Sequence, residues 1–125
     1  LKDWQKAINE LNKAIKIHSD KAYYYVYKAV CLEKNDRIKD AEINSNIAKT
    51  INPNIAMYYF NRCKVEYDIG NYEAATEEID KAIEIEEKFI YYNFKMRIFL
   101  KLNNPKEVDI YKTKAKQLQE IENLI

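Results

Sequence analysis

The chain has 125 residues, of which 47% are hydrophobic and 33% are charged, and its formal net charge at pH 7 is +1. This composition suffices for a buried core, and the near-neutral charge gives no field that would attract nucleic acid or an anionic membrane. One glycine and two prolines argue against a β-rich or linker-rich protein. We therefore expect a single all-α domain over residues 1–125.

Apolar residues recur at helical spacing in successive segments, and this periodicity predicts about seven amphipathic helices. In chain order, the predicted helices span residues 2–17, 21–34, 36–51, 55–69, 71–86, 88–102 and 105–124. Ser19 or Asp20 is expected to cap the second helix and Asn71 the fifth, because short polar side chains accept hydrogen bonds from free helix N–H groups. Pro105 fits the first turn of the last helix.

The connections between these helices are short. Gly70, the only glycine, suits the left-handed conformation that ends a helix, and Asn103 is expected to take the same turn because asparagine tolerates it best after glycine. Short connections make consecutive helices pack antiparallel. Small residues at Cys63, Ala75 and Ala82 would let the two backbones of the central hairpin approach closely.

The same pattern returns along the chain at a nearly constant interval. Alanines recur at 7, 41 and 75 and at 14, 48 and 82, and an aromatic or aliphatic residue recurs at 4, 38 and 72, all at intervals of 34. Asp36 and Gly70 share this interval, and the next step, from Gly70 to Asn103 and from Ala82 to Ala115, is 33. Agreement of several positions on one period indicates a repeated helical hairpin.

A helix–turn–helix unit of this length resembles the tetratricopeptide repeat. The family's order of aromatic, small, glycine and alanine positions is matched by Tyr59, Cys63, Gly70, Tyr72, Ala75, Ile79 and Ala82, and in the preceding unit by Tyr25, Ala29, Ala41, Ala48 and Pro53. The sequence departs from the family pattern where it has Lys28 and Arg62 for leucine, Ser45 for a large apolar residue, Glu87 for proline and Val108 for alanine.

The resemblance implies a right-handed superhelix of stacked antiparallel hairpins, an α-solenoid of about three and a half repeats. It divides the chain into the second helix of a truncated repeat (1–19), a repeat (21–53), another repeat (55–87) and a degenerate repeat that ends in a long C-terminal capping helix (88–125). Because Leu1 falls almost at the start of a second helix, we expect the chain to be part of a longer protein.

The sequence lacks the residues that catalytic and metal sites require. His18 is the only histidine, which is too few for a His–Cys metal cluster or a Ser–His triad, and one glycine cannot build a phosphate-binding loop. Cys31 and Cys63 are expected to be small packing residues. The glutamates of the fifth helix are expected to form an exposed face: Glu73, Glu77, Glu78, Glu84 and Glu86. We expect no enzyme activity, cofactor or metal in this segment.

In the tetratricopeptide family, the first helices of successive repeats line a concave groove that contacts a peptide or a partner helix. Carried over by the repeat register, the groove residues are Tyr23, Val26, Tyr27 and Val30, then Met57, Phe60, Asn61, Lys64 and Tyr67, then Ile90, Asn93, Phe94 and Arg97. They lie off the packing stripe of each hairpin, so we expect them to be at least partly exposed, as an apolar surface that marks an interaction site. The abundance of tyrosine offers a second explanation, in which some of these rings only fill space between helices.

One type of groove can be tested against the sequence. Family members that hold the carboxylate tails of chaperones use lysine and asparagine on one inner face, asparagine on the next, then lysine and arginine. The equivalent positions here are Val26, Val30, Asn61, Ile90 and Phe94, and only Asn61 matches. A register shifted by one repeat matches nothing, so we expect no carboxylate clamp.

The resemblance therefore implies a protein–protein interaction scaffold that binds an apolar peptide or helix of another protein, or of the parent chain. Two alternatives stay open: a structural or oligomerisation module that self-associates through the C-terminal helix, by Leu118, Ile121, Leu124 and Ile125, and a regulatory domain of a larger protein. RNA binding is disfavoured because the inner faces lack a regular set of base-reading polar residues. No signal peptide or membrane-length apolar run is present, so we expect a cytoplasmic protein without membrane insertion.

Overall fold

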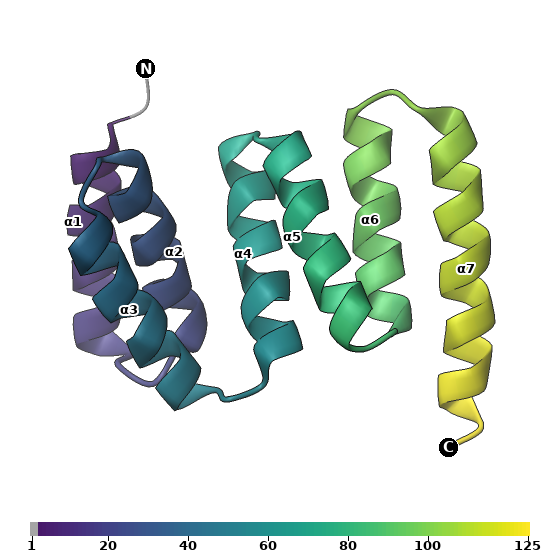
Figure 1. Ribbon diagram of the computed structural model, residues 1–125, viewed down its shortest axis with the longest axis horizontal. Coiled ribbons are helices and arrows are strands. Elements are labelled where there is room, and N and C mark those ends of the chain that lie inside the picture. The colour runs from purple at the N-terminus through teal and green to yellow at the C-terminus, as the bar shows by residue number, and fades with distance from the viewer. Residues whose placement is uncertain (1–2) are drawn as a thin grey trace.

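The computed structural model describes residues 3–125, and over this range the chain is all-α, with seven helices and no strand (Figure 1). The helices are α1 (Trp4–Ile17), α2 (Ala22–Lys34), α3 (Ile38–Ile51), α4 (Ile55–Ile69), α5 (Tyr72–Ile85), α6 (Phe89–Lys101) and α7 (Pro105–Asn123). These bounds lie within two residues of the predicted ones. The predicted start of the first helix, Lys2, lies outside the described residues.

Three helix ends adopt the left-handed turn that the repeat spacing indicates. The backbone φ angle is 59° at Asp36, 91° at Gly70 and 54° at Asn103, which confirms the turn expected at Gly70 and Asn103. Because Asp36 is left-handed, it cannot belong to α3, which begins two residues later than predicted. The three turns thus reverse the chain at equivalent points of successive hairpins.

Asparagine caps most of the helices that have a side-chain cap. Asn54, Asn71 and Asn104 each accept a hydrogen bond from the backbone N–H three residues later, at 3.0, 3.4 and 3.2 Å, which confirms the cap at Asn71. The cap predicted at Ser19 or Asp20 is wrong. Lys21 occupies the capping position of α2, and its side chain makes no cap hydrogen bond. Pro105 is at the start of α7, as expected.

The helices form a stack in which each packs against its neighbours in the chain, with the two termini at opposite ends (Figure 1). Contacts between α2 and α4 and between α5 and α6 join one hairpin to the next. The buried core extends across these contacts from one hairpin to the next. One buried cluster joins α4, α5 and α6, another joins α2, α3 and α4, and a third joins α1, α2 and α3.

Small residues allow the close approach of α4 and α5. Cys63, Ala75 and Ala82 are each 0% exposed, as the sequence predicts for the seam of the hairpin. Cys31 is also fully buried, so both cysteines are packing residues. Among the helices of residues 3–125, none combines the length and the apolar character needed to cross a bilayer.

Candidate functional site

The helices predicted to carry the groove, α2, α4 and α6, are joined by side-chain contacts. The Tyr23 hydroxyl on α2 donates a hydrogen bond of 3.2 Å to Asp68 Oδ2 on α4. Between α4 and α6, the Phe60 and Phe94 ring centroids are 5.5 Å apart, and those of Tyr67 and Phe94 are 5.1 Å apart. Side chains of these three helices therefore form one connected surface.

The expectation that all thirteen predicted groove residues are partly exposed is wrong for five of them. Val26, Val30, Phe60, Asn61 and Phe94 are between 1% and 8% exposed. Phe60 and Phe94 pack edge to face against each other across the junction of α4 and α6, while Val26 and Val30 belong to the cluster shared by α2, α3 and α4. Val26, Val30, Phe60 and Phe94 are thus buried in clusters that include an adjacent hairpin, which a pattern within a single helix does not reveal.

The other eight predicted residues reach the surface. Ile90, Asn93 and Arg97 are exposed, and five are half-buried: Tyr23, Tyr27, Met57, Lys64 and Tyr67. We call these eight residues the inner surface. It is made of tyrosine rings, two aliphatic side chains, one amide and two cations. Phe60 and Phe94 are buried beneath the inner surface, so for these two rings the other explanation applies: they fill space between helices.

The two cations of the inner surface lie over aromatic rings. Lys64 Nζ is 5.0 Å from the Tyr23 ring centroid and 4.8 Å from that of Phe60. Arg97 Cζ is 5.6 Å from the Tyr67 centroid and 5.0 Å from that of Phe94. Burial lowers the pKa of Lys64 below its usual value. Ring contacts therefore hold both cations in place, and the partial burial of Lys64 would strengthen its attraction to an anion.

The tyrosines at the α2 end of the inner surface keep their protons. Burial raises the pKa of Tyr23, and the adjacent Asp68 carboxylate raises it further. Burial likewise raises the pKa of Tyr27, whose ring meets that of Tyr23 edge to face at 6.0 Å. These side chains offer apolar ring faces and neutral hydroxyls, a combination suited to contact with another protein.

Two hollows adjoin the inner surface. One, of about 350 Å³, is lined in part by Tyr23, Met57 and the end of α3. The other, of about 260 Å³, lies between α1 and α2 and is lined by Ala7, Glu10, Leu11 and Tyr27. Side chains of a bound segment would find space in both.

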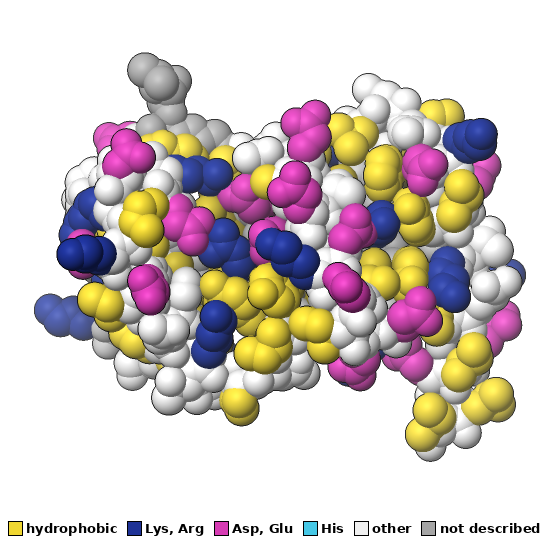
Figure 2. Space-filling view, viewed as in Figure 1, with side chains coloured by type: hydrophobic (Ala, Val, Ile, Leu, Met, Phe, Trp, Pro, Cys, Tyr) yellow, Lys and Arg dark blue, Asp and Glu magenta, His cyan; other side chains and the backbone are white. Residues whose placement is uncertain are grey.

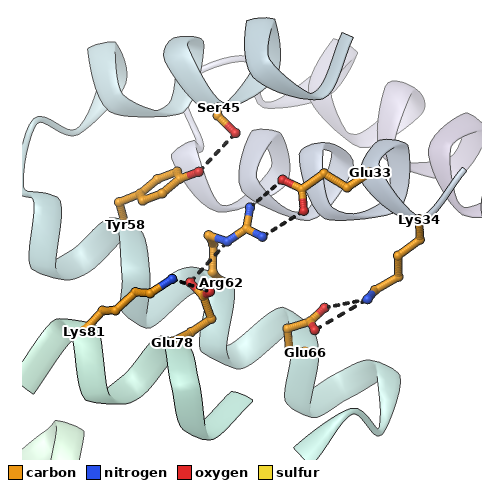
Figure 3. A network of polar contacts seen from close by, with 8 residues as sticks. All are labelled: Glu33, Lys34, Ser45, Tyr58, Arg62, Glu66, Glu78 and Lys81. Atoms are coloured by element: carbon orange, nitrogen blue, oxygen red, sulfur yellow. Dashed lines mark hydrogen bonds and ion pairs between the residues drawn. The ribbon is translucent and has the colours of Figure 1, made fainter. Parts of the chain in front are cut away.

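A partly buried ionic network, absent from the sequence-based predictions, joins α2, α4 and α5 (Figure 3). Arg62 donates two hydrogen bonds to Glu33, at 3.0 and 2.8 Å, and one to Glu78 Oε2 at 3.2 Å. Lys81 Nζ lies 3.3 Å from Glu78 Oε1. Burial opposes the charge of Arg62, but the hydrogen bonds and charges of Glu33 and Glu78 outweigh it and raise its pKa.

The network corrects the prediction for one glutamate of α5. Glu78 is 8% exposed and pairs with Arg62, whereas Glu73, Glu77, Glu84 and Glu86 form the exposed face that was expected. The signal was available in the sequence: Arg62 takes a position that the family fills with leucine, and a cation in such a buried position needs an acid nearby.

Two further polar contacts lie beside this network (Figure 3). Lys34 Nζ is 3.2 Å from Glu66 Oε1, and the Tyr58 hydroxyl donates a hydrogen bond of 3.0 Å to Ser45 Oγ. Ser45 thus replaces a large apolar residue because the Tyr58 side chain reaches it. These pairs join adjacent hairpins, and we assign them a structural role.

The side chains with potential for catalysis or metal binding are dispersed. The Cys63 thiol is fully buried, and burial raises its pKa well above the usual value, so it is held as the unreactive thiol. His18 is exposed at the end of α1. Within residues 3–125, no group of three or more histidine, cysteine or acidic side chains is arranged to hold a metal ion.

The far end of α7 exposes several aliphatic side chains. Ile121 is 55% exposed, Leu124 87% and Ile125 102%. Hydrophobic side chains are visible at the end of the molecule where Figure 1 places the end of α7 (Figure 2). Leu118 is half-buried, so it belongs in part to the packing of α7 on α6.

No protein-family model matches this chain, and no curated protein matches it either.

Proposed function

We propose that this chain is a protein-interaction scaffold of the tetratricopeptide type, which holds a peptide or helix of a partner protein against the inner surface. One observation carries the proposal: eight side chains from three successive first helices reach the surface, and ring and cation contacts connect five of them, Tyr23, Tyr27, Lys64, Tyr67 and Arg97, directly or through Phe60 and Phe94. Surfaces of this composition are typical of interaction sites, because rigid aromatic side chains lose little entropy on binding and bury a large area.

The buried aromatic residues support the side chains of the inner surface. Phe60 and Phe94 fix the positions of Lys64, Tyr67 and Arg97, which lie on them. A variant that removes these rings would lose core packing as well as binding. Residues whose side chains reach the surface are therefore the appropriate sites for substitution.

The test uses selection of binding peptides from a random dodecapeptide display library with the chain as bait. Met57→Gln combined with Ile90→Gln should weaken the selected peptides at least about tenfold, because two aliphatic contacts are lost. Ile17→Gln combined with Ile43→Gln is the matched control. It removes two exposed aliphatic side chains from α1 and α3, outside the inner surface, and should leave affinity unchanged.

Thermal unfolding followed by circular dichroism shows whether both double variants are folded. Peptides that bind both variants as well as the unmodified chain would locate the site elsewhere. Failure to select any saturable binder would count against a peptide-binding function.

A second candidate function, self-association through α7, is favoured by the exposed Ile121, Leu124 and Ile125. Sedimentation equilibrium should then give a mass above that of the 14.9 kDa monomer, and Ile121→Gln with Leu124→Gln should restore the monomer. A monomer at all concentrations would exclude this function for the chain. Substitutions on the inner surface leave the mass unchanged under either outcome.

A further inference from the structure

The two cations of the inner surface form no ion pair with a carboxylate among residues 3–125, although the charge of Asp68 acts on Lys64. Lys34, Arg62 and Lys95 each pair with an acid on another helix, at 3.2, 2.8 and 2.6 Å. Neither Lys64 nor Arg97 forms an ion pair within the described chain. Asp68, one helical turn after Lys64, instead accepts the hydrogen bond of Tyr23.

The environment of these cations prepares them for an anionic ligand. Each lies over two aromatic rings, and burial partly removes the water around Lys64, as the lowered pKa of its ammonium group reflects. A charge with reduced hydration gains more from an opposite charge than a fully hydrated one, because less water must be displaced and the local dielectric is lower. Lys64 and Arg97 are therefore free to form ion pairs with an anionic ligand, and these pairs would contribute to its binding.

We propose that the inner surface recognises a protein segment with two acidic side chains, one paired with Lys64 and the other with Arg97. Apolar residues of the same segment would lie on the tyrosine rings and on Met57 and Ile90. The inference rests on the proposed function and specifies its ligand. Charge complementarity selects this occupant, since two cations without an ion pair on a surface of rings, aliphatic groups and one amide favour an acidic segment over a neutral one.

The ring geometry limits the separation of the two acids. Lys64 Nζ, the Phe60 centroid, the Phe94 centroid and Arg97 Cζ are joined by steps of 4.8, 5.5 and 5.0 Å. The two cationic groups are therefore at most about 15 Å apart, and an extended chain that advances about 3.3 to 3.6 Å per residue covers this distance in about four to five residues. In an extended partner segment, the acids should thus lie within about five positions of each other.

The ligand is tested with the random dodecapeptide display library on the unmodified chain. We expect the selected pool to be enriched in pairs of Asp or Glu at this spacing. For a synthetic peptide from the pool, Lys64→Gln with Arg97→Gln should weaken binding at least about tenfold. Replacement of both peptide acids by their amides should have a similar effect on the unmodified chain.

The matched control is Lys112→Gln with Lys116→Gln, which removes two exposed positive charges from α7. It should leave the affinity unchanged, which separates local pairing from net charge. The affinity of the unmodified chain for the acidic peptide should also fall with rising salt concentration. Together with the amide peptide, this measurement tests the charge pairing on the unmodified chain even if the Lys64 and Arg97 variant does not fold.

The outcomes distinguish this inference from the function on which it rests. Selected peptides without acidic pairs, with affinity insensitive to salt and to the Lys64 and Arg97 substitutions, would overturn the inference and leave the interaction scaffold in place. A library that yields no saturable binder would overturn both.

Discussion

At the scale of single residues, Arg62 is the clearest case of a side chain that departs from the repeat pattern and has a structural reason to do so. It forms three hydrogen bonds to Glu33 and Glu78 across two helix interfaces. Glu33 is half-exposed and can recover water if the arginine is removed, whereas Glu78 is buried and cannot. The stability of the network therefore depends on keeping Glu78 paired.

Arg62→Leu should lower the free energy of unfolding by about 2 kcal/mol, because Glu78 would lose its arginine partner and keep only the exposed Lys81 as a counter-charge. Adding Glu78→Leu should restore most of this loss, since replacement of a buried ion pair by apolar side chains is often neutral. Arg37→Leu, which breaks the exposed pair with Asp40, is the control and should cost less than about 1 kcal/mol. Urea denaturation measures all three. An equal cost at Arg37 and Arg62 would contradict this account.

Tyr92 gives a residue-scale prediction for alkaline pH. Burial and the hydrogen bond of 2.7 Å to Glu87 raise its pKa from 10.0 to about 12. Between pH 10 and 12, the unfolded chain releases this proton while the folded chain keeps it, so the free energy of unfolding should fall as pH rises. Denaturation curves across this window should be less pH-dependent for Tyr92→Phe. An unchanged pH dependence would show that Tyr92 titrates normally in the folded chain.

At the scale of elements, the sequence was sufficient to locate the helices and their turns. Helical periodicity and the placement of glycine, asparagine and proline at helix ends are local properties of the sequence. For this reason α4 and α7 begin at the predicted residues. The exposure of the groove positions depends on contacts between hairpins, so it is not a local property of the sequence. Val30 and Phe60 belong to buried clusters that include residues of the next hairpin, and a single helix pattern does not contain that information.

Gly70 provides a prediction at the end of α4. Its φ angle of 91° is unfavourable for residues with a side chain, while a Cβ placed there would meet no atom within 4 Å. Gly70→Ala should therefore cost about 1 kcal/mol of unfolding free energy through backbone strain alone. Gly70→Asn should cost less, because asparagine occupies the same turn at residue 103. Equal stability of the alanine and asparagine variants, measured by thermal unfolding, would contradict a left-handed turn.

At the scale of the whole molecule, stability should follow the linear order of the stack. Each helix contacts its chain neighbours, and α2 with α4 and α5 with α6 provide the contacts between hairpins. α4 and α5 occupy the middle of this chain of contacts, so the terminal hairpins depend on them. In such arrays the stability is a sum of unit and interface terms, and loss of a central interface also affects the adjacent units.

Ala75→Glu tests this coupling at the α4–α5 seam. Ala75 is 0% exposed, and a buried carboxylate there should cost about 4 kcal/mol of unfolding free energy. Ile85→Glu adds the same charge at a position of α5 that is 53% exposed, and should cost less than about 1 kcal/mol. Amide hydrogen exchange should show faster exchange in α2 and α6 as well as in α4 and α5 of the Ala75 variant, because both outer hairpins lose a packed neighbour. Faster exchange confined to α4 and α5 would mean that the hairpins are independent units.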